Sequence, residues 1–228
     1  MQLDVLWSGP IEVRPIYHRL ALNGKVRALY VSDLHFAFWN RPVLQQLEQL
    51  LRRVRPDLLL LGGDLVDVPW GMGAFKATLG RWSQWLPVLA VPGNHDRLCG
   101  LKRLRAELPL TAWLDQQPWL HESGLRLCGC PQQQATPSAI FVGHEPHLVG
   151  QVARKNFPLM LAGHLHGCQW IAWQHRGFDY PGAWFFAYHG PHFRVGGTDL
   201  HVSRGVNDTL PARVNCPRDV LLLELSPA

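Results

Sequence analysis

Five short apolar segments of this chain each run directly into a cluster of polar residues, and this repeated arrangement constrains the fold more than any other feature. Short apolar runs bounded by turn residues are typical of buried strands. Ligands bind outside the carboxyl ends of the strands in an open α/β sheet, so we expect the clusters to meet if the strands lie side by side. The segments are Leu29–Ser32, Leu58–Leu61, Leu89–Val91, Ile140–Val142 and Leu159–Ala162. They lead to Asp33-Leu34-His35, Gly62-Gly63-Asp64, Gly93-Asn94-His95-Asp96, Gly143-His144-Glu145 and Gly163-His164-Leu165-His166.

Helical patterns separate these apolar segments. Apolar residues recur at helical spacing through Pro42–Arg55, and Asn40 is placed to cap the start of that helix. The dipeptide Asn23-Gly24 predicts a β-hairpin that joins strands at 19–22 and 26–31. Strands that alternate with helices predict an α/β fold built in layers.

Composition indicates a folded chain and narrows its location. Hydrophobic residues make up 47% and charged residues 17% of the 228 residues, so the chain can bury a sizeable core, and we expect residues 1–228 to form one domain. Neither a signal peptide nor an apolar run long enough to span a bilayer is evident. The five cysteines include no CxxC pair, which is typical of reduced thiols. We therefore expect a cytoplasmic protein, with peripheral contact to a membrane left open.

The charge of the chain is compatible with an anionic substrate but does not identify one. The formal net charge is +5, and the basic residues are spread along the sequence. A mildly positive surface attracts anions. Because no basic stripe is evident, we expect no nucleic-acid partner.

The polar clusters contain the side chains that bind metals. Asp, His and Asn without cysteine favour Mn²⁺, Fe or Zn²⁺ over Ca²⁺, which prefers shells made only of oxygen. Six or seven such ligands exceed the four that a single zinc ion needs. A pair of metal ions about 3.5–4 Å apart, bridged by a carboxylate, accounts for the surplus.

The ordered motifs Asp-x-His, Gly-Asp, Gly-Asn-His-Asp, Gly-His and Gly-His-x-His resemble those of the calcineurin-like metallophosphoesterase family. The match runs from about Leu29 to His166, and the segments Leu200–Val206 and Leu210–Pro217 are similar to the tail of a bacterial single-domain branch. The resemblance implies an α/β fold, a four-layer βαβ sandwich of two mixed sheets flanked by helices.

The resemblance also implies a role for each motif residue. His95 would lie near the leaving group without binding a metal, and Asp96 would orient it. Three ligands would hold the first metal ion, three would hold the second and one would bridge both: Asp33, His35 and His166; Asn94, His144 and His164; and Asp64. One departure is Cys168, because the related bacterial branch usually has a second glycine there.

The activity that the resemblance implies is hydrolysis of a small-molecule phosphoester by hydroxide that two metal ions activate. A phosphodiester, a pyrophosphate and a phosphomonoester all remain open as substrates. One alternative is a pyrophosphatase of the UDP-2,3-diacylglucosamine type, which acts on a lipid-linked substrate. Others are a single-metal hydrolase such as an amidase and a non-catalytic scaffold, although a scaffold has no need of the complete ligand set or of His95.

Three further features have more than one interpretation. Arg204 could contact a phosphate of the substrate or lie in a solvated loop. Asp67, three residues after Asp64, is expected to cap the next helix. The aromatic-rich segment at about 170–193 could cover the core, line a pocket for acyl chains, or dock on a membrane surface.

Overall fold

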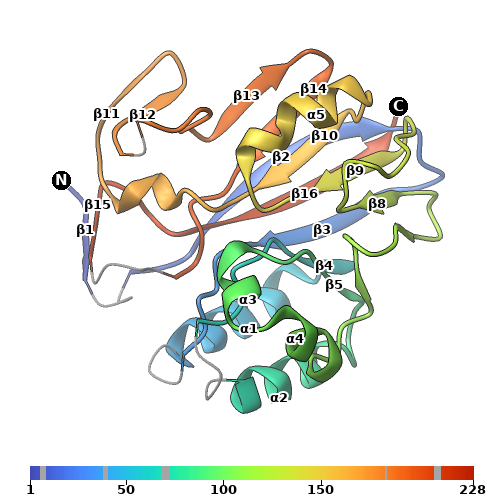
Figure 1. Cartoon of the computed structure of the whole chain (residues 1–228), viewed down its shortest axis with the longest axis horizontal. Coiled ribbons are helices and arrows are strands. Elements are labelled where there is room, and N and C mark those ends of the chain that lie inside the picture. Colours follow the sequence, from blue (N-terminus) through green and yellow to red (C-terminus); the bar gives the residue numbers. More distant parts are fainter. Residues whose placement is uncertain (6–8, 38–40, 68–71, 183, 208–211) are drawn as a thin grey trace.

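A computed structural model describes residues 1–5, 9–37, 41–67, 72–182, 184–207 and 212–228 of the chain (Figure 1). The predicted cap at Asn40 lies outside these residues, as does the first part of the predicted tail segment Leu210–Pro217. Among the described residues, no helix has the length and apolar character required to cross a bilayer.

Two six-stranded mixed sheets form the centre of the molecule. The first has the order β2-β16-β3-β4-β5-β6. Its strands are β2 (Glu12–Leu20), β16 (Asp219–Pro227), β3 (Val26–Val31), β4 (Leu58–Leu61), β5 (Val88–Ala90) and β6 (Ala112–Trp113). The second has the order β13-β14-β10-β9-β8-β7. Its strands are β13 (His192–Val195), β14 (Thr198–Val202), β10 (Leu159–Ala162), β9 (Ala139–Val142), β8 (Arg126–Cys128) and β7 (Trp119–Leu120).

Helices cover the outer face of each sheet (Figure 1). The first sheet is covered by α1 (Arg41–Val54), α2 (Met72–Trp82), α3 (Asn94–Leu98) and α4 (Leu101–Glu107). The second carries η3 (Pro146–Leu148) and α5 (Val149–Arg154). Two small sheets complete the fold, one of β1 (Leu3–Val5) with β15 (Ala212–Val214) and one of β11 (Ile171–His175) with β12 (Phe178–Pro181). The predicted four-layer α/β architecture is confirmed.

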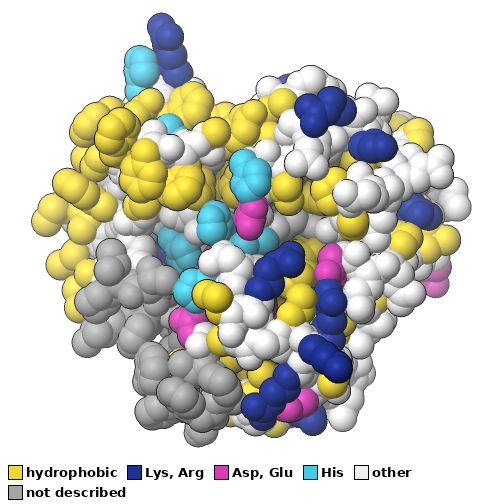
Figure 2. Space-filling model, viewed as in Figure 1, with side chains coloured by type: hydrophobic (Ala, Val, Ile, Leu, Met, Phe, Trp, Pro, Cys, Tyr) yellow, Lys and Arg dark blue, Asp and Glu magenta, His cyan; other side chains and the backbone are white. Residues whose placement is uncertain are grey.

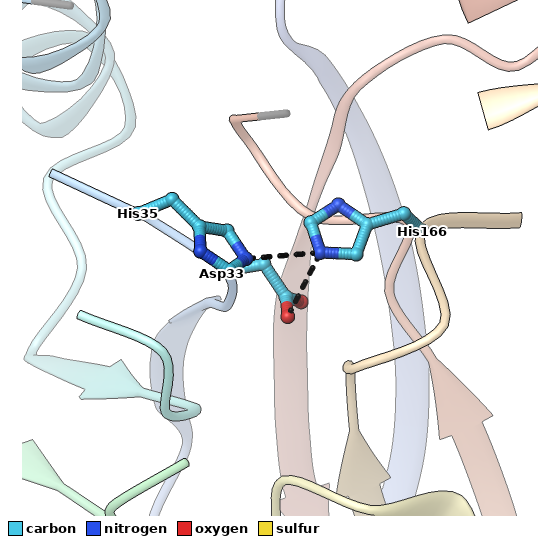
Figure 3. A group of neighbouring side chains, drawn as sticks. All are labelled: Asp33, His35 and His166. Carbon is cyan, nitrogen blue, oxygen red and sulfur yellow. Dashed lines mark hydrogen bonds and ion pairs between the residues drawn. The ribbon is translucent and has the colours of Figure 1, made fainter. Parts of the chain in front are cut away.

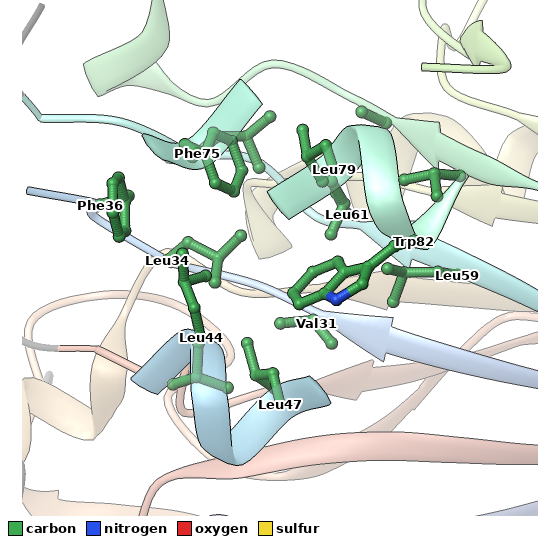
Figure 4. Packing of buried hydrophobic residues seen from close by; sticks show 14 of the residues in the cluster. Val31, Leu34, Phe36, Leu44, Leu47, Leu59, Leu61, Phe75, Leu79 and Trp82 are labelled. Atoms are coloured by element: carbon green, nitrogen blue, oxygen red, sulfur yellow. The ribbon is translucent and has the colours of Figure 1, made fainter. Parts of the chain in front are cut away.

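The alternation of side chains along each strand explains the layers. In β3, Ala28 and Tyr30 pack between the two sheets, whereas Leu29 and Val31 face the helices. Successive side chains of a strand point to opposite faces, so a strand that is apolar throughout needs a cover on both sides. Figure 4 shows the helix side of this arrangement, where Trp82 of α2 packs close to Val31 and Leu59.

The predicted hairpin at Asn23-Gly24 is wrong. Strand β16 lies between β2 and β3, pairing parallel with the first and antiparallel with the second. A tight hairpin turn of the type that Asn-Gly favours needs positive φ at both residues, and neither Asn23 nor Gly24 has it. The strongly apolar β16, which is buried over most of its length, takes the central position that a local hairpin would have closed.

Trp82 gives a direct test of the packing between the helices and the first sheet. Its side chain is 1% exposed, and we expect Trp82→Ala to lower the free energy of unfolding by about 3–5 kcal/mol because it leaves a large cavity. Trp85 is the matched control, since it is 44% exposed and contacts only the guanidinium of Arg52 among the ring contacts described. Trp85→Ala should cost about 1 kcal/mol or less in the same urea titration. Equal losses for the two variants would contradict the assigned packing.

Candidate metal centre

The five apolar strands divide between the two sheets. Strands β3, β4 and β5 are parallel neighbours in the first sheet, and β9 and β10 are parallel neighbours in the second. The polar clusters that follow them meet where the two sheets face each other, rather than along the edge of a single sheet. The seven predicted metal ligands all lie in the segments that directly follow these strands, with Asn94 at the start of α3 and His166 at the start of the 3-10 helix η4 (His166–Gln169). Four follow strands of the first sheet and three follow strands of the second: Asp33, His35, Asp64 and Asn94; and His144, His164 and His166.

Asp33, His35 and His166 form the first group that can hold a metal ion (Figure 3). His166 Nε2 lies 3.1 Å from His35 Nε2 and 3.4 Å from Asp33 Oδ1. Asp33 is fully buried, and both of its carboxylate oxygens accept the backbone N–H of His164 at 3.1 Å. The group therefore joins a loop of the first sheet to a loop of the second.

Asp64, His144 and His164 form a second group, and Asn94 contacts it. One atom of this group, His144 Nε2, contacts the three other side chains. It lies 3.2 Å from Asp64 Oδ2, 3.1 Å from Asn94 Oδ1 and 3.2 Å from His164 Nδ1. The other ring nitrogen of His144 donates to the carbonyl oxygen of Gly62 at 2.8 Å, which directs Nε2 toward the group.

The carboxylate of Asp64 lies between the two groups. Its Oδ2 atom is 3.2 Å from His144 Nε2 and 3.8 Å from His35 Nε2. Its Oδ1 atom accepts the backbone N–H of His95 at 2.8 Å, which fixes the orientation of the carboxylate. A Cβ atom on Gly93 would lie 2.0 Å from Oδ1, so only glycine leaves room for Asp64 at this position.

The two imidazoles of the first group are oriented to accept a cation. His35 Nδ1 lies 2.7 Å from Asp67 Oδ1, and His166 Nδ1 lies 3.1 Å from the carbonyl oxygen of Asn207. Each Nδ1 donates its proton to that acceptor, so in the neutral rings the two facing Nε2 atoms both carry lone pairs. Lone pairs 3.1 Å apart repel each other, and a cation between them removes the repulsion. This set of nitrogen and carboxylate donors fits a divalent transition metal.

Five of the seven ligand residues have a left-handed backbone conformation. The φ angles of Asp33, His35, Asp64, His164 and His166 lie between 38° and 74°. Side chains other than that of glycine adopt this region infrequently, at a cost of about 1–3 kcal/mol for a residue held there. The loops therefore store strain at the positions that direct these side chains toward one another.

Asp67, and not Asp96, orients His95. Asp67 Oδ1 lies 2.9 Å from His95 Nδ1 and 2.7 Å from His35 Nδ1, so one carboxylate contacts a predicted ligand and the predicted proton donor. Asp96 is buried below the loop, where its oxygens accept the backbone N–H groups of Gly93, Leu65 and Val66. Asp96, which was expected to orient His95, therefore shapes the turn that carries it, whereas the carboxylate that contacts the imidazole is that of Asp67.

A cavity of about 280 Å³ opens beside the two groups. Its lining comprises His35, Asp64, Asn94, His95, His164, Leu165, His166, Cys168, Gln169 and Phe186. Arg204 does not line it, because its guanidinium donates to the carboxylate of Asp179 at 3.1 Å. Among the described residues, neither lysine nor arginine reaches the cavity wall.

A family model for calcineurin-like phosphoesterases matches residues 26–168, well over half of the chain. The chain belongs to the calcineurin-like phosphoesterase family. The matched region contains both groups of predicted ligands, and the family is one of metal-dependent hydrolases. The protein is therefore a phosphoester hydrolase that uses divalent metal ions.

One sequence relative and two similar solved structures align with most of the length of this calcineurin-like phosphoesterase. Phosphodiesterase YaeI of Escherichia coli K12 is 27% identical over 236 residues, which span 92% of this chain and 87% of that protein. The crystal structure of the nuclease MPE of Pseudomonas putida is 20% identical, with a TM-score of 0.44 over 82% of this chain and 79% of that one. The protein TT1561 of Thermus thermophilus is 14% identical, with a TM-score of 0.44 over 79% and 90% of the two chains.

The carboxylates of this phosphoesterase site control the protonation of its histidines. Burial lowers the pKa of His144, but the hydrogen bond to Asp64 and the charges of Asp33 and Asp64 outweigh it and raise the pKa to about 9. Burial likewise opposes protonation of His35, whose contact with Asp67 nevertheless raises its pKa. Burial and the charge of His144 lower the pKa of His164. Without metal, the site therefore retains protons at neutral pH.

Metal binding should release protons from this site. A ligand imidazole must be deprotonated, and the pKa of His144 of about 9 means that at pH 7 the metal displaces a proton from it. We expect the apparent affinity for Mn²⁺ to rise by about tenfold for each pH unit below the pKa of His144 and to level off above it. Calorimetric titrations at pH 7 in two buffers with different ionisation heats measure the released protons. Observed heats that are identical in the two buffers would mean that no proton is released and would contradict the assignment.

Two residues that contribute to the site were missed in the sequence. Asp67 was assigned to a helix cap, although its position three residues after Asp64 could have suggested a second carboxylate on the same loop. Asn207 accepts from His166 Nδ1 through its carbonyl and donates through its side chain to the carbonyl of Leu34 at 2.7 Å. No local pattern around Asn207 indicates this role, since its partners lie 41 and 173 residues away.

Proposed function

We propose that this phosphoesterase binds a pair of divalent metal ions and hydrolyses phosphodiester or pyrophosphate bonds of a small molecule. The observation that carries the proposal is the position of Asp64, whose carboxylate lies within 3.8 Å of an imidazole in each group. A carboxylate shared by two ligand sets is the arrangement that a bridged metal pair needs. The first ion would take Asp33, His35 and His166. The second would take Asn94, His144 and His164.

The donor set favours a transition metal over Mg²⁺ or Ca²⁺. Imidazole nitrogen supplies most of the ligands, with carboxylate and amide oxygens completing them, and no thiolate belongs to either group. Such mixed nitrogen and oxygen sets suit Mn²⁺, Fe or Zn²⁺. Mn²⁺ is the first ion to test, because it binds more weakly than the others and its removal and return are easily controlled.

The protein's own side chains position the reaction. When bound, the two ions supply polarisation of the phosphoryl oxygens and a lowered pKa for water at neutral pH. His95 lines the cavity, its side chain is 35% exposed, and Asp67 fixes its Nδ1 at 2.9 Å. In the imidazolium form, in which both ring nitrogens carry a proton, Nε2 could give its proton to the departing oxygen and leave the neutral ring with its Nδ1 proton hydrogen-bonded to Asp67. Asp64 holds the backbone of His95 in register with the ligands.

The cavity favours substrates with a single negative charge on the reacting phosphate. A phosphomonoester is mostly a dianion at pH 7, whereas each phosphate of a diester carries one charge. Enzymes that bind dianionic phosphate commonly use arginine or lysine for the second charge. The described cavity wall contains neither, which supports diester or pyrophosphate substrates over monoesters. The phosphodiesterase activity named for the Escherichia coli relative is in line with this preference.

A lipid-linked pyrophosphate is the second candidate substrate. Phe186 forms part of the cavity wall, and its ring centroid lies 6.3 Å from that of His164. An apolar wall directly beside the reacting centre is suited to an acyl or prenyl group attached through the phosphate. A UDP-2,3-diacylglucosamine type of substrate has this combination of a pyrophosphate and acyl chains.

Metal content and substrate preference can be measured on one sample. We expect about two metal ions per chain after Mn²⁺ loading, and hydrolysis of bis-p-nitrophenyl phosphate that EDTA abolishes and Mn²⁺ restores. The rate with p-nitrophenyl phosphate should be lower by about tenfold or more, the effect of roughly 1.4 kcal/mol of missing charge stabilisation. A faster monoesterase would overturn the diester preference. If the protein bound no metal and hydrolysed neither substrate, the result would favour the scaffold alternative.

A further inference from the structure

Five exposed aromatic side chains form one surface beside the metal centre. Exposed fractions range from 43% to 66%, and Figure 2 shows hydrophobic side chains gathered along one side of the hollow that contains the histidines. We call this surface the aromatic face; it consists of Trp170, Trp173, Trp184, Phe185 and Phe186. It holds three of the four exposed tryptophans among the described residues, the fourth being Trp85.

A small packed layer holds the aromatic face outward. The β11–β12 ribbon places Trp173 flat against Tyr180, with centroids 5.7 Å apart and planes 9° from parallel. Beneath them, His189 is 7% exposed and packs against the rings of Phe178 and Tyr180. Residues 170–193 therefore form a small packed layer in which their own aromatic rings bury His189. The expectation that its aromatic residues serve mainly to cover the core does not account for rings that face solvent.

The aromatic face leads directly into the cavity. The ring of Phe185 lies 6.2 Å from that of Trp184 and 4.6 Å from that of Phe186. Phe186 lines the cavity and lies edge-on to the predicted ligand His164. Any binding partner that covers the aromatic face therefore also lies against the opening of the cavity beside the predicted metal ligands.

The charged side chain that residues 170–193 expose to solvent is positive, and their carboxylate is buried. The single carboxylate in residues 170–193 belongs to Asp179, which is 2% exposed and bonded to Arg204 and Gln174. Arg176 is exposed at the turn between β11 and β12 and has no ion-pair partner among the described residues. The surface that solvent sees is therefore apolar and cationic, with no exposed anion.

We propose that the aromatic face docks on the surface of an anionic lipid bilayer. Tryptophan and phenylalanine rings lie favourably at the level of the headgroups, and an arginine beside them is attracted to anionic lipid. Docked in this way, the cavity faces the membrane, so a phosphoester attached to a lipid reaches the site while its chains remain in the bilayer. This consequence for the substrate rests on the proposed function, but the docking itself requires no turnover.

Partition to vesicles tests the docking. The metal-loaded protein is mixed with vesicles of phosphatidylglycerol, or of phosphatidylcholine, and sedimented at low and at high salt. We expect binding to phosphatidylglycerol vesicles, weakened by salt, and quenching of tryptophan fluorescence when the lipid chains are brominated. Trp184→Ser with Phe185→Ser should weaken the partition by roughly tenfold or more, and Arg176→Gln by roughly fivefold. Trp85→Ala is the matched control and should bind as the wild type does.

The outcomes separate docking from catalysis and from other occupants. Absence of binding to phosphatidylglycerol vesicles, or equal binding by the double variant, overturns the proposal even if bis-p-nitrophenyl phosphate is hydrolysed. Binding that Trp85→Ala weakens as strongly as the double variant also overturns it. If sedimentation without lipid shows a dimer that the double variant abolishes, and no vesicle binding occurs, the face instead binds a second copy. Vesicle binding by a protein that hydrolyses no phosphoester supports the docking and contradicts the proposed function alone.

Discussion

Asp64→Asn is expected to lose metal and activity together. The Asp64 side chain is almost fully buried, and its carboxylate lies 3.2 Å from His144 Nε2 and 3.8 Å from His35 Nε2. An amide keeps the size but removes the negative charge that the proposed bridging position between two cations requires. We expect kcat/KM for bis-p-nitrophenyl phosphate to fall by roughly 10³-fold or more, which corresponds to about 4 kcal/mol of transition-state stabilisation. Metal content measured by mass spectrometry should fall below two ions per chain.

Asp57→Asn controls for the chemical change itself. Asp57 is exposed and accepts the backbone N–H of Arg27 at 2.7 Å, far from the cavity lining. This variant should keep both its metal content and its rate. If Asp64→Asn retained two ions at full occupancy, Asp64 could not be the bridging ligand, and the proposed pair would need a different shared donor.

His95→Ala is expected to separate catalysis from metal binding. His95 stands beside the ligand groups and is held by Asp67, while its backbone N–H bonds to Asp64. Alanine keeps that backbone hydrogen bond, so the metal content should remain unchanged. For substrates whose leaving oxygen needs a proton, kcat should fall by roughly 10²–10⁴-fold, the usual contribution of a general acid.

The dependence on the leaving group identifies the role of His95. A nitrophenolate leaves without protonation, so the loss with bis-p-nitrophenyl phosphate should be much smaller than with an alkyl diester. An equal loss for both substrates would indicate that His95 stabilises the phosphoryl group instead of the leaving oxygen. An undiminished rate with the alkyl diester would exclude the acid role.

Much of the fold could be predicted because its signals are local. Leu58–Leu61 and Leu159–Ala162 are buried strands with the bounds that their apolar runs indicate. The wrong hairpin at Asn23-Gly24 shows where local patterns fail. Strand β16 comes from the C-terminal end of the chain and lies between β2 and β3, which therefore do not pair with each other. No residue near Asn23 indicates that β16 takes this position.

In the candidate site, too, local sequence patterns predict some features, whereas contacts between distant residues could not be predicted. The predicted ligands come together because each follows a strand end, and strand ends are visible in the sequence. The partner of His95 was assigned to its chain neighbour Asp96, whereas the carboxylate that contacts it is Asp67, 28 positions earlier. For Arg204 the sequence leaves a phosphate contact and a solvated loop open, and it gives no sign of the ion pair that the guanidinium makes with Asp179 of the aromatic-rich segment. These pairings depend on how loops pack, which neither periodicity nor motif spacing encodes.

Two of the three groups of possible ligands combine donors from both sheets, and this has a mechanical consequence. An ion held by Asp33, His35 and His166, or by Asp64, His144 and His164, would link the two halves of the sandwich. Sliding one sheet along the other would break coordination bonds as well as apolar contacts. We therefore expect bound metal to raise the resistance of the fold to unfolding and to proteolysis, since binding to the folded state alone adds to its stability.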